Sequence, residues 1–204
     1  MKTAQLKYLQ IATLGLIAIL AGALKAEEHE EHHGHEEREH LHEEISAFLK
    51  EDPEGVELMR FVKTNFPSEI PAFVEAAIKR EPEMAREVVE QLAEVREDYL
   101  FFTEEAPEEA QLFLNIQKHE LLSMVLSRSF DPEAKHAKEI EVKIRNEVEA
   151  AFDLKMEMEK NQIRYLETEI QELNQLLQER EALRGQIIQR RIDALTGANE
   201  HLEW

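Results

Sequence analysis

Apolar residues recur at three- and four-residue spacing through most of the chain beyond residue 40, which is the period of an amphipathic α-helix. The longest such run extends from Glu133 to about Leu195, with no proline and a single glycine, Gly185. At about 1.5 Å per residue, a helix of this length would span roughly 90 Å. We therefore expect an all-α protein: an antiparallel helical bundle with one very long C-terminal helix that forms a coiled coil, along which the shorter helices pack.

The apolar stripe of this long run narrows to a coiled-coil seam in its second half. The seam positions step by three and four residues: Ile163, Leu166, Ile170, Leu173 and Leu177. The stripe then moves to a neighbouring face, and Arg180 and Arg184 occupy the next seam positions. A small domain cannot cover so long a helix. We therefore expect the seam to be covered by a second copy of the chain, as a homo-oligomer (dimer), or by an envelope protein. A helical hairpin within one chain is the alternative.

A proline followed by a glutamate recurs in the middle of the chain, at Pro53, Pro82, Pro107 and Pro132. Proline is favoured at the first helical position because its missing N–H has no partner within the helix. The spacing predicts helices of about 20 residues joined by tight turns. Asp131 is the expected N-cap of the long helix, and Thr196-Gly197 is its expected C-terminal stop. Pro67 and Pro71 are expected to bracket one further break.

The first 26 residues have the layout of a secretory signal peptide. Lys2 and Lys7 precede an apolar stretch, and the small-residue rule allows cleavage after Ala23 or Ala26. The uncharged run between Lys7 and Lys25 has 17 residues, the lower limit for crossing a bilayer, so an uncleaved anchor is the alternative. We expect a periplasmic or secreted protein that stays on a membrane only if the signal is not removed.

Composition narrows the range of functions. The formal net charge of −20 argues against nucleic-acid binding, because phosphate contacts need clustered Lys and Arg side chains. The absence of cysteine excludes disulfides, thiolate metal sites and a cysteine nucleophile. The sequence contains neither a glycine-rich phosphate loop nor a serine in a nucleophile-elbow context. We therefore expect that the protein is not an enzyme.

Residues 27–44 interleave histidine with glutamate, and six of the chain's 9 histidines lie here. Neutral imidazole binds Zn, Ni, Cu and Co, and neighbouring carboxylates add oxygen ligands. We expect a flexible tail up to about Gly34 and a helix beyond it. A solvated acidic N-terminus with incidental histidines is the alternative. The predicted metal ligands are His29, His32, His33, His35, His40, His42, Glu36 and Glu39.

These patterns predict five segments: a signal peptide (1–26), a His/Glu-rich tail (27–44), short helices (45–130), the long helix and coiled coil (131–197) and a C-terminal tail (198–204). They also predict two functions. The first is an exported acidic protein that binds divalent transition metals through residues 27–44, in metal or envelope stress. The alternative is a structural or adaptor coiled-coil protein of the cell envelope that has no metal role.

The stretch 173–197, LNQLLQEREALRGQIIQRRIDALTG, carries leucines and arginines at helical spacing. With the signal-like start and the histidines that follow it, this stretch resembles the long helices of the periplasmic metal-stress proteins of the Spy/CpxP/ZraP and CnrX-type group. The resemblance covers about the last third of the chain. It implies a small helical hairpin fold, dimers, and either metal sensing or a holdase activity.

Overall fold

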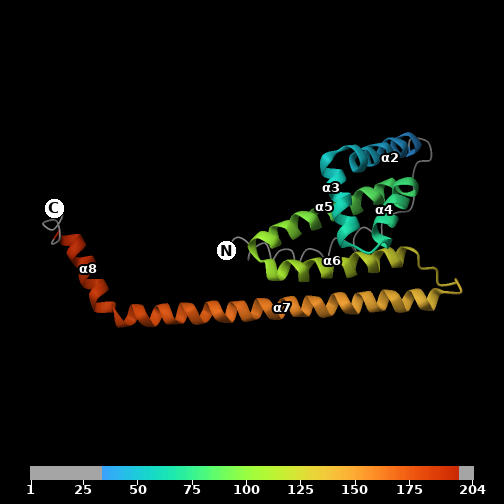
Figure 1. Cartoon of the computed structure of the whole chain (residues 1–204). Coiled ribbons are helices and arrows are strands. Elements are labelled where there is room, and N and C mark those ends of the chain that lie inside the picture. Colours follow the sequence, from blue (N-terminus) through green and yellow to red (C-terminus); the bar gives the residue numbers. More distant parts are fainter. Residues whose placement is uncertain (1–33, 198–204) are drawn as a thin grey trace. The chain divides into compact units, whose positions relative to one another are not determined.

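The computed structural model describes residues 34–197, without the side chains of residues 34–36. All regular structure in this range is α-helical, which confirms the predicted all-α bundle. The predicted signal peptide, the first three histidines of the His/Glu tract and the C-terminal tail lie outside the described residues. The helices are α2 (Gly34–Glu51), α3 (Pro53–Asn65), α4 (Glu69–Arg80), α5 (Pro82–Glu105), α6 (Pro107–Arg128), α7 (Ala137–Ala182) and α8 (Arg184–Thr196) (Figure 1).

The chain divides into two compact units between Lys155 and Met156. The first unit contains α2 to α6 and the beginning of α7, and the second contains the rest of α7 with α8. Within residues 34–197, no helix combines the length and the apolar character needed to cross a bilayer.

Helix α5 is the centre of the first unit, and it contacts α2, α3, α4 and α6. The expectation that the short helices pack along the long one holds only for α6 at the beginning of α7, since α7 buries only Ala151 of its described residues. Both helices have charged residues along their length, but the apolar face of α5 is buried, whereas apart from Ala151 that of the start of α7 is half-buried or exposed. No polar or charged residue is buried in the described part of the chain. The buried residues of α5 are Pro82, Ala85, Val88, Val89, Leu92, Val95 and Phe102.

Three of the four predicted proline starts are confirmed: α3, α5 and α6 begin at Pro53, Pro82 and Pro107. Asp52 caps α3, because its side-chain oxygen accepts the backbone N–H of Glu54 at 2.8 Å. These starts depend on chemistry within a few residues, which is why the sequence predicts them well.

The fourth predicted start, at Asp131, is wrong. The Oδ1 atom of Asp131 does accept the backbone N–H of Glu133 at 2.9 Å, but α7 begins only at Ala137. Residues 131–136 are all exposed. No packing therefore holds a further helical turn at the point where the chain reverses direction between α6 and α7 (Figure 1).

Two other predicted helix boundaries have different outcomes. The break expected between Pro67 and Pro71 is shorter than predicted, since α4 begins at Glu69. Pro71 lies in its first turn, where a missing N–H breaks no helical hydrogen bond. The stop at Thr196-Gly197 is confirmed, because α8 ends at Thr196 and Gly197 has a left-handed φ of 68°.

The predicted continuity of the long helix up to Leu195 is also wrong, because Leu183 separates α7 from α8 with φ −94° and ψ 7°. The Leu183 N–H still donates to the Glu179 carbonyl at 3.0 Å, and its carbonyl accepts from the Ile187 N–H at 2.9 Å. Gly185 lies two residues further on, and a glycine costs a helix about 1 kcal/mol relative to alanine. The residues around it are exposed, so no packing compensates for this cost.

Candidate functional site

The second unit carries a row of exposed apolar side chains along α7, which we call the seam. It consists of Ile163, Leu166, Ile170, Leu173 and Leu177, with exposed fractions from 45% at Leu166 to 59% at Leu177. From Met156 to Gly197 no described residue is buried. Single exposed leucines are common on soluble proteins, but a contiguous apolar row usually marks an interaction surface. The seam is therefore the candidate functional site.

The seam has the residue types of a two-stranded coiled coil. In heptad notation, Ile163 and Ile170 occupy position a, and Leu166 and Leu173 occupy position d. Among parallel coiled coils, a β-branched residue at a with leucine at d favours two strands over higher oligomers. Leu177 occupies the next a position, and it is the most exposed of the five.

Charged residues bound the seam at both ends. Glu159 occupies the d position before it, and Arg180 the d position after it, with Lys160 and Glu181 beside them. Within the described part of the chain, these four side chains make no ion pair. Their charges are therefore available to a partner that covers the seam.

In the first unit, the start of α7 is attached to α6, and the two helices run antiparallel (Figure 1). The Nδ1 atom of His119 lies 2.6 Å from Oε2 of Glu147, and Glu120 pairs with Lys155. Ala151 lies one helical turn from Glu147 and one from Lys155, and it is buried. Sequence reasoning missed this contact because the paired residues lie far apart in the chain. It holds the beginning of α7 on the helical body.

The structure describes the side chains of only three predicted metal ligands, Glu39, His40 and His42. Helix α2 includes the second half of the His/Glu tract, with Glu39 and His40 exposed and His42 half-buried. Among the residues that the structure describes, no group of three or more His, Asp or Glu side chains is placed to hold a metal ion. The predicted set remains a prediction, since its other members have no described side chain: His29, His32, His33, His35 and Glu36.

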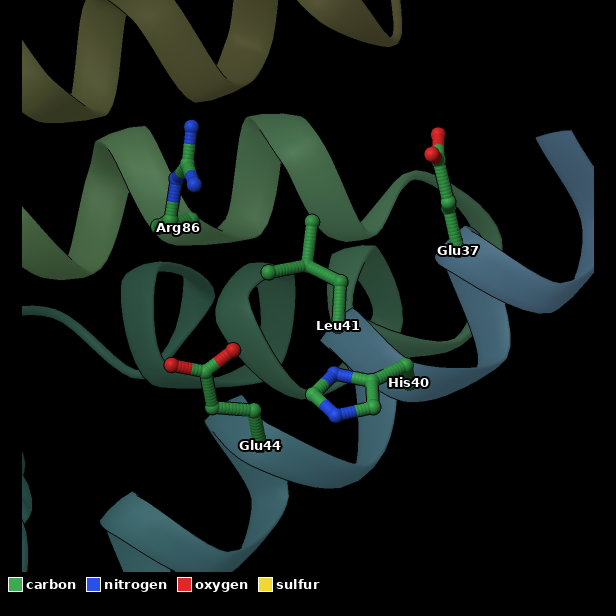
Figure 2. A pocket seen from close by; sticks show the side chains of 5 residues that line it. All are labelled: Glu37, His40, Leu41, Glu44 and Arg86. Atoms are coloured by element: carbon green, nitrogen blue, oxygen red, sulfur yellow. The ribbon is translucent and has the colours of Figure 1, made fainter.

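A shallow, open depression lies between α2 and α5 (Figure 2). Leu41 projects toward the space between the helices, and the Glu37 carboxylate points away from the His40 ring. Arg86 adds a positive charge to the wall, which opposes the binding of a cation. The lining residues are Glu37, His40, Leu41, Glu44 and Arg86.

No protein-family model matches the chain, and neither the curated proteins nor the solved structures gave a match. The resemblance to the periplasmic metal-stress group therefore remains a prediction, and a function has to be inferred from the chain's own surfaces.

Proposed function

We propose that this protein is a helical adaptor that self-associates through the seam of α7, so that a second copy of the chain covers the exposed row. The supporting observation is the exposure of all five seam residues, between 45% and 59%. Burying a half-exposed Leu or Ile side chain contributes roughly 1 kcal/mol, and two identical seams provide this contribution twice.

A second copy is the favoured occupant because every copy presents the same seam, and the seam has the composition of a two-stranded coiled coil. The formal net charge of −20 opposes the approach of two copies. Apolar contact and local charge pairs along α7 therefore have to supply the free energy of association. The first unit keeps its own apolar core and remains a separate compact body in this arrangement.

Two acids placed in the seam test this proposal. We expect Ile170→Asp combined with Leu173→Asp to reduce the mass measured by light scattering from that of a dimer to that of one chain. The physical reason is that each acid would have to lose its water in the apolar interface.

The matched control is Thr168→Asp combined with Gln175→Asp, which adds the same charge to the outer f positions of the same turns. This control should keep the dimeric mass. A wild-type protein with the mass of one chain, unchanged in the seam variant, would contradict the proposal.

As a second function, we propose that the His/Glu tract binds a divalent transition metal, Zn, Ni, Cu or Co, with modest affinity. The observation that favours it is the start of α2 at Gly34. A helix from this residue onward places His35 one turn from Glu39, and Glu36 one turn from His40, in backbone position. Export and a role in metal or envelope stress remain predictions from the sequence.

Replacing all six histidines of the tract by asparagine tests the metal role without removing the part of α2 that packs on the body. We expect isothermal titration with Zn²⁺, Ni²⁺ and Cu²⁺ to show at least tenfold weaker binding, because the nitrogen ligands are lost. His136→Asn is the control, since His136 is exposed and lies far from the tract in sequence. Equal binding by all three proteins would remove the metal role.

A further inference from the structure

The charged core positions at the two ends of the seam are of opposite sign, Glu159 at one end and Arg180 at the other, and this distinguishes the two ways of pairing two copies. We infer that the pair is antiparallel, with Leu166 of each copy opposite Leu177 of the other and the two-fold axis between Gln171 and Glu172. This inference rests on the self-association proposed above, and it adds the orientation and the register.

A parallel, in-register pair would place like charges against each other. Glu159 would face its own copy at a core position, and so would Arg180 and Arg184. The apolar layers would match, but three charged layers would each hold two equal charges, which destabilises a core position. No acid lies within the seam itself to compensate for the arginines.

The antiparallel register removes these three repulsions and replaces those at Glu159 and Arg184 with an attraction. Glu159 lies opposite Arg184 of the second copy, and Lys160 flanks Glu181 of the second copy. Each of these pairs occurs twice because of the two-fold axis.

The remaining layers of this register are apolar or nearly so. Ile170 faces Leu173, Leu166 faces Leu177, and Ile163 faces Arg180 of the second copy. The aliphatic part of the arginine covers the isoleucine while its guanidinium stays in water. An antiparallel register shifted by one heptad would instead place Leu177 opposite Glu159, without a compensating charge for that glutamate.

A charge exchange within one chain tests the orientation. We expect Lys160→Glu alone and Glu181→Lys alone to weaken self-association roughly five- to tenfold in sedimentation equilibrium at low salt, because an attractive pair becomes repulsive at two places. The double variant should restore the affinity of the wild type to within about twofold. In a parallel pair, Lys160 and Glu181 would lie about 30 Å apart along the helix. The double variant would then show no restoration, which would overturn the inference.

Cysteine cross-linking gives a second readout, because the chain contains no cysteine of its own. We expect a mixture of the Leu166→Cys and Leu177→Cys full chains to form a disulfide-linked dimer on oxidation, whereas neither variant alone does so. In the antiparallel pair, each introduced cysteine lies about 16 Å from its own copy along the axis. A disulfide needs Cα atoms within about 7 Å. Thr168→Cys and Gln175→Cys, at outer positions, are the controls and should remain unlinked.

The outcomes test the antiparallel orientation and the self-association separately. Efficient linking of Leu166→Cys to itself and of Leu177→Cys to itself, with a dimeric mass for the unmodified protein, would show a parallel pair. That result would overturn the orientation and leave the coiled coil in place. A protein with the mass of one chain and no link in any mixture would overturn the self-association as well.

Discussion

Gly55 marks the closest approach of α2 and α3 in the first unit. A Cβ atom added at this glycine would lie 2.0 Å from the carbonyl oxygen of Phe48 and 2.6 Å from its carbonyl carbon. Both are backbone atoms, so neither can rotate out of the way. The glycine therefore provides space between two helices, whereas Gly197 provides a left-handed backbone conformation.

Substituting alanine at Gly55 should lower the free energy of unfolding by about 1–3 kcal/mol, the usual cost of overpacking. Urea denaturation followed by circular dichroism measures this change. The control is Gly185→Ala, since a Cβ at Gly185 would meet no atom within 4 Å beyond its own stretch of helix. Alanine there should stabilise the helix by up to about 1 kcal/mol. Equal destabilisation by the two variants would show that the α2–α3 distance is not the cause.

The sequence could not distinguish Gly55 from Gly185, because the space around each glycine depends on tertiary contact. The same is true of His119 and Glu147, whose side chains meet only when α7 lies against α6. The start of α3 at Pro53 was predictable because it depends on residues of a single turn, in which Asp52 also accepts the Glu54 N–H.

At the scale of helices, periodicity predicted which segments are helical but not which helix is central. Helices α5 and α7 both carry apolar residues at three- and four-residue spacing, yet α5 is the one surrounded by four neighbours. The prediction missed the start of α7 at Ala137 and the interruption at Leu183, because no strong local signal marks either position. Both depend on whether neighbouring side chains pack against the turn, and here the surrounding residues are exposed.

The central position of α5 predicts a large difference between two leucines. Leu92→Ala should lower the free energy of unfolding by 2–5 kcal/mol, because Leu92 has an exposed fraction of 0% and its loss leaves a cavity. Leu195→Ala in α8 should change it by less than about 0.5 kcal/mol, since Leu195 is 69% exposed. Urea titrations of both variants test this difference. A small effect at Leu92 would mean that α5 does not organise the core.

At the scale of the whole molecule, the two units differ in how far their apolar side chains are exposed to water. The first unit buries an apolar core among α2 to α6, although Leu100 and Phe152 stay exposed, and the second unit leaves its apolar side chains in water along the seam. The sequence predicted the seam residues because their spacing lies within one helix, where geometry is fixed by the backbone alone. It predicted a metal set over residues 27–44 from composition, and composition does not determine which side chains meet.

The interior of the first unit contains apolar side chains only, so every charge of its described residues lies at the surface. A charge that stays in water can be gained, lost or reversed without the desolvation penalty of a buried ion. Apart from the half-buried pairs that hold α7 on α6, the surface of this body is therefore free to drift in acidity over evolutionary time, while the interior remains under selection for shape. Solubility can then adapt to a new environment by substitutions that leave the fold unchanged.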